Sequence, residues 1–368
     1  MTAEWALRHH AHDTPPLRID LLADPSLTND DAAVVFDVLL GRYAGPRLLD
    51  GDRSIVIPSH GVPGSGGVKI KGAGYRGGLV RLGTPHRRPY ALPRYDAEGG
   101  ATVDAAKDHG RAVGGGMSYQ QARQELVVSR HLEVRGMRVP RGLGYGVVRR
   151  GSDSSWFCLL DMPFGGYRDW WHTARTRDGV ERVAIAFGAT QRELAGHGVY
   201  LALSGLMAIE DELVRKDFHT AHIAGPNDTF LTRLAYYLFD TNFILAQFST
   251  DSYLRKATEH RELARRTYLH ALTCHDFAPS QIDAFKSLLV ELKFADWPME
   301  ERISRLAGDA IGNGILREFA DASGERELLG AMEPQSEAPA PAEGESLGGS
   351  PVPQAAGRRR FAATLRRR

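Results

Sequence analysis

Two lysines, Lys69 and Lys71, alternate with Val68 and Ile70 in a short segment that ends at Gly72. Alternation of apolar and polar residues is typical of a β-strand. A lysine held on a rigid strand can present a fixed positive charge to the phosphate groups of a nucleotide. The segment therefore predicts a phosphate-binding lysine, with Lys71 as the candidate. Solvated lysines before a turn are the alternative.

Chemistry on a nucleotide phosphate requires a few further groups in a set order along the chain. A carboxylate on the next helix must hold the lysine, and Glu125 lies inside a predicted helix at 118–135. An Asn or Asp and a further Asp must bind Mg²⁺, whose hard charge prefers oxygen ligands. Asn227, in a loop, and Asp240, after the apolar run at 234–239, stand where these two ligands are expected. The set predicts a site for ATP and Mg²⁺.

Each of these residues also suits an ordinary structural role, and the sequence alone leaves both interpretations open. Glu125 can be one of several solvated charges on a helix surface. Asn227 follows Gly-Pro in a sequence typical of turns. Asp240 can cap a helix that begins at Thr241. The order of the set, rather than any single residue, favours a functional site.

The part of the chain that carries Lys71 and Glu125 is predicted to be rich in β-structure. Runs of β-branched or alternating residues between Gly, Pro and polar turns indicate strands at 54–57, 67–71, 144–148 and 155–160. A helix is expected at 32–42 after Asp30 and Asp31. The helix at 118–135 has Ser118 as its N-cap and Gln121 at the capping-box position.

From about residue 166 the pattern becomes helical. One or two helices are expected at 184–215, and others at 254–272, 279–294 and 299–321. A β-rich part with one long helix, followed by a helical part, predicts an α+β fold of the protein-kinase-like, bilobed type. The segment Asp161-Met162-Pro163 breaks the last predicted strand and is the expected hinge.

Four regions follow from these patterns. An N-terminal extension at 1–44 is expected to be irregular up to residue 30 and is followed by a β-rich lobe at 45–162, which carries a long insertion at 75–110. A helical lobe is expected at 163–330. The tail at 331–368 is rich in Glu, Pro, Ala, Gly and Ser and ends in arginines, so it is predicted to be disordered.

The overall composition excludes several classes of protein. The 368 residues include 46 basic and 45 acidic ones, which argues against a dedicated nucleic-acid binder, apart from contacts that the arginine-ended tail could make. Two cysteines give no disulfide framework. No apolar run suits a membrane span, and no secretory signal is recognised. A cytoplasmic protein is therefore expected, with export without a cleaved signal as the alternative.

A histidine stands where a kinase-like chain has the Asp of its catalytic loop. His222 can accept a proton near neutral pH, and Asp228 follows it in the same loop. We therefore predict His222 and Asp228 as the catalytic groups. A histidine that only packs in the core or in a loop is the alternative.

The N-terminal lobe resembles the selenoprotein O family of kinase-fold protein adenylyltransferases over roughly residues 43–140. Ile70–Gly74 resembles the family's Leu-Lys-Gly-Ala/Ser-Gly, and Leu49–Arg53 resembles its Leu-Gly-Asp-Gly-Arg loop. Gly110–Val113 matches its Gly-Arg-Ala-Val. Arg123–Leu126, ahead of Gly136 and Val139-Pro140, is similar to its Arg-Glu-Phe/Tyr helix before Gly-Ile-Pro.

The resemblance implies a Mg-ATP-dependent enzyme that transfers AMP to a protein hydroxyl, with ATP flipped relative to its pose in kinases. It implies a Lys71–Glu125 pair. It also implies ATP contacts from residues in the matching segments and nearby: Asp50, Gly51, Asp52, Arg53, Asp108 (or, in its place, His109), Gly110 and Arg111. Arg168 is a loose substitute for an arginine segment of the family that is absent here.

The chain departs from the family in its metal loop. The family's Asn-Thr-Asp-Asn is replaced by residues 222–228, in which Asn227 can take the metal role, and Pro226 precedes it in place of an acidic base. Two other functions stay open. One is an ordinary phosphotransferase of the same fold, and the other is a catalytically inactive pseudokinase that binds a partner.

Overall fold

The computed structural model describes residues 5–11, 17–50, 54–59, 61, 66–73, 95–100, 116–201, 205–294 and 299–326. Six of the predicted ATP-contacting residues lie outside these ranges, namely Gly51, Asp52, Arg53, Asp108, Gly110 and Arg111. The tail at 331–368 and most of the insertion at 75–110 also lie outside them.

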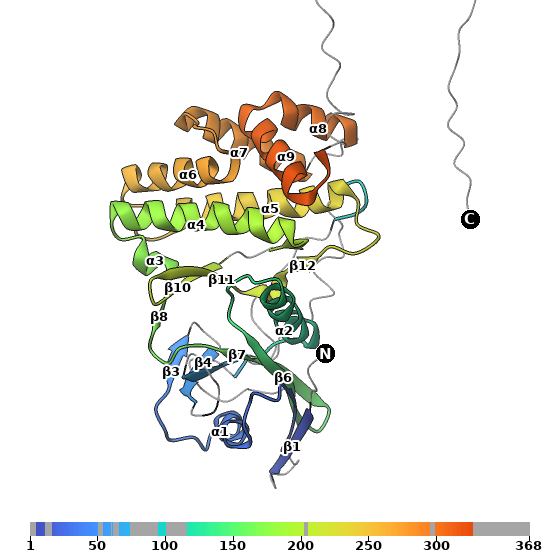
Figure 1. The fold of residues 1–368 in the computed structure, drawn as a ribbon, viewed down its shortest axis with the longest axis vertical. Helices are drawn as coiled ribbons and strands as arrows, with labels where there is room; N and C mark the ends of the chain where they lie inside the picture. Colours follow the sequence, from blue (N-terminus) through green and yellow to red (C-terminus); the bar gives the residue numbers. More distant parts are fainter. Residues whose placement is uncertain are drawn as a thin grey trace, which may run out of the picture.

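The first half of the chain is built on one antiparallel sheet of seven strands, drawn in blue and green in Figure 1. Its order is β1-β2-β6-β7-β5-β4-β3. The strands are β1 (Trp5–Ala11), β2 (Leu17–Ala23), β3 (Leu48–Asp50), β4 (Ser54–Pro58), β5 (Gly67–Lys71), β6 (Gly142–Arg150) and β7 (Asp153–Asp161). The predicted hairpin at 54–71 is present as β4 and β5, which pair antiparallel.

Among the described residues of this lobe there are two helices, and side-chain caps set where both begin. Helix α1 (Asn29–Leu39) starts earlier than predicted because Thr28, rather than an aspartate, caps it. Helix α2 (Tyr119–Val134) begins with the predicted capping box, in which Ser118 and Gln121 satisfy each other's backbone N–H groups. Helix α2 packs on β6 and β7 and carries Glu125 toward the second lobe.

The N-terminal residues were expected to be irregular, and this prediction is wrong. Strand β2 pairs with β6 across the whole length of β2, and β1 pairs with β2 at the edge of the sheet. Ile19, Leu21 and Ala23 alternate along β2 and are buried with the apolar face of α1. The extension therefore completes the core of the first lobe.

The second lobe is helical and forms the upper part of Figure 1. Its helices are α3 (Trp170–Thr173), α4 (Arg177–Gly196), α5 (Phe230–Thr250), α6 (Thr258–Thr273), α7 (Pro279–Phe294), α8 (Met299–Gly308) and α9 (Ala310–Ser323). Within the described ranges, no helix has the length and apolar character needed to cross a bilayer.

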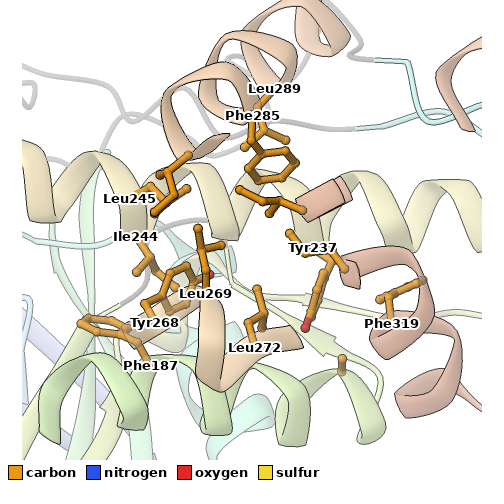
Figure 2. Close-up of a cluster of buried hydrophobic side chains, with 14 of the residues drawn as sticks. Phe187, Tyr237, Ile244, Leu245, Tyr268, Leu269, Leu272, Phe285, Leu289 and Phe319 are labelled. Atoms are coloured by element: carbon orange, nitrogen blue, oxygen red, sulfur yellow. The ribbon is translucent and has the colours of Figure 1, made fainter. Parts of the chain in front are cut away.

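The core of the helical lobe lies between α4, α5, α6, α7 and α9. Figure 2 shows large apolar and aromatic side chains from these helices meeting there, among them Phe187, Tyr237, Tyr268, Phe285 and Phe319. Burial of aromatic side chains on this scale is the main stabilising contribution available to such a lobe. This packed core supports the short strands of the helical lobe, which lie on the side of the seven-stranded sheet.

The prediction of helix throughout 184–215 is wrong beyond Gly196. Gly198 has φ +68°, a left-handed conformation that ends the helix. The chain then forms short strands in place of a second helix. These are β8 (Tyr167–Asp169), β9 (Val199–Tyr200), β10 (Gly205–Ile209), β11 (Glu212–Lys216) and β12 (His222–Ile223), with a 3-10 turn η3 (Phe218–Thr220) before β12. The apolar run 205–209 lies inside the range predicted to be helical, but it forms the middle strand of a three-stranded sheet, β11-β10-β8.

The chain passes from the large sheet to the helical lobe after β7. Strand β7 ends at Asp161, and β8, the next strand, already belongs to the small sheet of the helical lobe. The fold is therefore α+β and bilobed, with the order of elements of a protein-kinase-like fold: an antiparallel sheet with one long helix, a hinge, and a helical lobe.

Asp161 at the hinge should make stability depend on pH. Burial raises the pKa of its carboxyl to about 6, and Arg141 opposes this only in part. The folded state therefore disfavours ionisation of the Asp161 carboxyl. The free energy of unfolding falls as the pH rises from the pKa of this carboxyl in the unfolded chain through 6. We expect Asp161→Asn to raise the free energy of unfolding by about 1 kcal/mol at pH 8. This figure is reduced for solvent screening because the carboxyl is only partly buried.

Thermal unfolding at two pH values checks this expectation. The gain in Tm should be about 2 °C at pH 8 and about half of that at pH 5. The exposed Asp211→Asn is the matched control and should show no such dependence. An equal gain at both pH values would refute the assignment.

Candidate functional site

Lys71 and Glu125, predicted as a pair, are in contact. Lys71 Nζ donates to Glu125 Oε2 at 2.9 Å, and the two side chains are 5% and 1% exposed. Strand β5 and helix α2 hold them in place. Gly72 ends β5 with φ +95°, where a Cβ would lie 2.8 Å from Trp156 O, so only glycine fits at this turn.

A second carboxylate, Asp217, reaches the same ammonium group. Lys71 Nζ donates to Asp217 Oδ1 at 2.8 Å. Asp217 directly follows β11 and has φ 69° and ψ 47°, a left-handed conformation that few side chains other than Asp and Asn adopt. It is followed by Phe218, so Asp217-Phe218-His219 stands where a kinase-like chain has Asp-Phe-Gly. Asp217 is the main site residue that our sequence analysis missed.

His219 completes the surroundings of the lysine. Its backbone N donates to Glu125 Oε2 at 2.7 Å, and its ring Nδ1 lies 3.0 Å from Lys71 Nζ. An ammonium group has three donors and no acceptor. The three N–H groups of Lys71 therefore point to Glu125, Asp217 and Nδ1 of His219. We assign Nδ1 as the unprotonated nitrogen of the His219 ring.

The charges of this cluster stabilise one another. Burial alone would raise the pKa of Glu125, but the charge of Lys71, whose Nζ lies 2.9 Å from Oε2, lowers it to about 2. Burial also opposes ionisation of Asp217, but Lys71 and Lys216 hold its pKa well below the ordinary value. For Lys71, burial is outweighed by Asp217 and Glu125, which raise its pKa. The lysine and both carboxylates are thus ionised at neutral pH.

Two further lysines lie beside the first. Lys69, on the same face of β5, forms an ion pair with Asp50 at the end of β3. Lys216, at the end of β11, forms an ion pair with Asp169 of β8 and lies 3.9 Å from Asp217 Oδ2. Asp50, predicted to contact ATP, is thus held by a lysine, and burial of its carboxyl is outweighed by Lys69 and Lys216, which lower its pKa.

The predicted metal pair is not at this site. Asn227 is exposed in the turn before α5. Asp240 lies in the middle of α5, neither at the end of a strand nor at a helix N-cap, because the apolar run before it is part of the same helix. Its charge acts on the buried Arg215 in the helical lobe. Asp217 occupies the place that Asp240 was predicted to fill.

The two predicted catalytic residues meet each other. His222 Nε2 lies 2.8 Å from Asp228 Oδ2, which also accepts from Gly225 N. The imidazole stacks on Tyr236 with ring centres 4.1 Å apart, and its centre lies 6.3 Å from that of the Tyr200 ring. The pair is therefore rigidly held beside β9, through the pairing of β12 with that strand.

Arg168, the loose substitute for the family's arginine segment, points away from the cluster. It is exposed on β8, between Tyr167 and Asp169. Successive side chains on a strand face opposite ways. Because Asp169 faces Lys216, Arg168 faces solvent.

A kinase-like fold implies Mg²⁺, and the residues available fit it poorly. The catalytic Asp and the metal-binding Asn belong between the long helix and the next strand pair. Residues 197–204 there read His-Gly-Val-Tyr-Leu-Ala-Leu-Ser, with no Asp, Glu or Asn. Across the described ranges, no group of three His, Cys, Asp or Glu side chains is arranged to hold a metal. Asp217 is left without a second ligand from that segment.

Comparison with known proteins adds little to this geometry. No protein-family profile matches the chain, and no curated protein matches it. A solved structure of WaaP in complex with acyl carrier protein is 16% identical, with 79% of this chain and 91% of that chain covered and a TM-score of 0.30. A glucosamine kinase structure is 14% identical, with 89% and 94% covered and a TM-score of 0.31. At these TM-scores neither comparison carries an argument about function.

Proposed function

We propose that the protein binds ATP between its two lobes and is a transferase of the kinase-like class, with transfer of AMP to a protein hydroxyl as its reaction. The observation that carries ATP binding is the contact of Lys71 with both Glu125 and Asp217. A lysine fixed between a helix carboxylate and an Asp-Phe aspartate is the phosphate-binding arrangement of this fold class.

The energetics of the cluster support a ligand-binding role over a purely structural one. Buried ion pairs stabilise a fold weakly, because desolvation of the charges offsets most of their attraction. Lys71 and Glu125 are nonetheless almost fully buried, and Asp217 adopts a left-handed backbone. Conformations of this kind cluster at functional sites.

The choice of AMP over phosphate rests on the resemblance of the segments around Leu49–Arg53, Ile70–Gly74 and Arg123–Leu126 to selenoprotein O proteins. The acceptor in this proposal is the hydroxyl of another protein or of the chain itself. His222, oriented by Asp228, is the proposed base, because residues 197–204 supply no carboxylate for that role.

Labelled ATP tests the reaction. With ATP labelled at the α-phosphate, the chain or an added protein mixture should acquire label, and with γ-labelled ATP it should not. Glu125→Gln is the control and should reduce labelling, because Lys71 loses the charge that positions it. Label transferred from the γ-position instead would identify a phosphotransferase.

A nucleotide-binding protein without transferase activity is the second candidate. The composition of residues 197–204 favours it, since this segment normally supplies the catalytic Asp and a metal ligand. This candidate predicts saturable ATP binding that depends on Lys71, with no label transferred from either position.

A further inference from the structure

We propose that Lys216 takes the place of a metal ion beside Asp217, so that this site binds nucleotide phosphates without a divalent cation. The choice of ATP as the ligand rests on the proposed function. The poor fit of these residues to a metal ion can be tested without ATP.

Both oxygens of Asp217 face an ammonium group. Oδ1 accepts from Lys71 at 2.8 Å, and Oδ2 lies 3.9 Å from Lys216 Nζ. In a kinase-like site, the free side of this carboxylate faces the metal ion. Here the free side faces a lysine, so the positive charge near Oδ2 comes from the chain itself.

Lys216 is fixed at this position from three sides. Asp169 accepts a hydrogen bond from its Nζ, and Asp217 Oδ2 lies 3.9 Å from the same ammonium group. The same Nζ lies 5.6 Å from the centre of the Trp171 ring, within the range of a cation–π contact. The side chain is 13% exposed. Lys216 is therefore held in a fixed position beside Asp217.

A divalent cation would meet repulsion and few ligands here. Two ammonium groups, of Lys71 and Lys216, lie next to the carboxylate that the Asp-Phe position supplies, and both would repel a divalent cation placed there. Two further carboxylates lie beside these lysines, but Asp169 is already bound to Lys216 and Glu125 is already bound to Lys71. The segment 197–204 adds no oxygen ligand from Asp, Glu or Asn side chains.

The lysines suit nucleotide phosphates, the ligand that Mg²⁺ normally accompanies. Lys69 and Lys71 come from β5 in the first lobe, and Lys216 comes from β11 in the second. Lysine binds phosphate as a point charge, without the geometric demands of a metal ion. These charges, drawn from both lobes, can offset part of the negative charge of a triphosphate once Asp50 releases Lys69 and Asp169 releases Lys216.

The first test measures Mn²⁺ alone, by electron paramagnetic resonance, on the full chain. Wild type should bind it weakly, and Lys216→Met should bind it about tenfold tighter or more, because one adjacent repulsion is removed. Asp217→Asn added to Lys216→Met should abolish the gain, and the exposed Lys256→Met should behave as wild type. Equal Mn²⁺ binding by wild type and Lys216→Met overturns the inference. Lys216→Gln serves if the Met variant does not fold.

The second test measures ATP binding by calorimetry in Mg²⁺ and in excess EDTA. The wild-type Kd should change by less than about twofold, whereas Lys216→Met should bind ATP only in Mg²⁺ or lose binding. Wild-type binding that disappears in EDTA overturns the inference while leaving the proposed function intact. Absence of ATP binding in both conditions defeats the proposed function instead, and the Mn²⁺ measurement then decides the role of Lys216.

Discussion

Lys71→Met is expected to lower the free energy of unfolding by about 3–5 kcal/mol, the effect of leaving buried charges without their partner. Glu125 and Asp217 would both lose the ammonium group that keeps their pKa values low. The same change should weaken ATP binding by about 1–3 kcal/mol, the range for a charge-assisted contact. Urea unfolding and calorimetric titration with ATP measure the two effects separately.

A double-mutant cycle separates the pair from the general consequences of substitution. Lys71→Met combined with Asp217→Asn should be less destabilised than the sum of the single variants, because each removes part of the other's unpaired charge. Lys71→Arg, which keeps the charge, should retain most of the stability. If Lys71→Met binds ATP as wild type does, the cluster is structural and the proposed function is wrong.

Local signals explain why Lys71 and Glu125 could be predicted from the sequence. Lys71 ends an alternating strand at a glycine, and Glu125 lies in a helix whose N-terminus is marked by Ser118 and Gln121. Each signal spans only a few residues, and each describes an element in which a side chain's direction follows from its position. The structure brings the two residues into contact.

Asp217 was missed because its element was misassigned. The apolar run at 205–209 lacks alternation, and an apolar run of this length does not distinguish a buried strand from a helix. Assigning it to a helix placed Lys216 and Asp217 at a helix end, so the Asp-Phe dipeptide after a strand was not recognised. A hairpin interpretation of β10 and β11, with a turn at Glu210-Asp211, would have revealed it.

Long-range pairing explains the error at the N-terminus. Strand β2 is held by β6, and Ile19 lies opposite Val148. Nothing within 17–23 identifies a partner so distant in the chain, and the surrounding Pro and Asp residues suggested an irregular segment. Its alternating Ile19, Leu21 and Ala23 were the available signal, since period-two burial is typical of strands.

Asp240→Asn should destabilise the helical lobe and leave the nucleotide site unchanged. Arg215 is fully buried, with Nε donating to Thr190 Oγ1 at 2.6 Å and Nη2 donating to Phe187 O at 2.8 Å. Burial lowers the pKa of this guanidinium, and the negative charge of Asp240 opposes that shift. Loss of the carboxylate leaves Arg215 without that charge, with its guanidinium 5.0 Å from the centre of the Phe187 ring. The expected loss is about 3 kcal/mol in the free energy of unfolding.

Comparison of Asp240→Asn with Asp217→Asn distinguishes the structural carboxylate from the functional one. Asp240→Asn should lower the urea midpoint while the folded protein keeps the wild-type Kd for ATP, because Asp240 acts on Arg215 in the helical lobe. Asp217→Asn should weaken ATP binding, because Lys71 and Lys216 lose the carboxylate that orients them. The exposed Asp211→Asn should change neither quantity by more than about 0.5 kcal/mol. If Asp240→Asn abolishes ATP binding at wild-type stability, Asp240 belongs to the nucleotide site, and our assignment of that role to Asp217 is wrong.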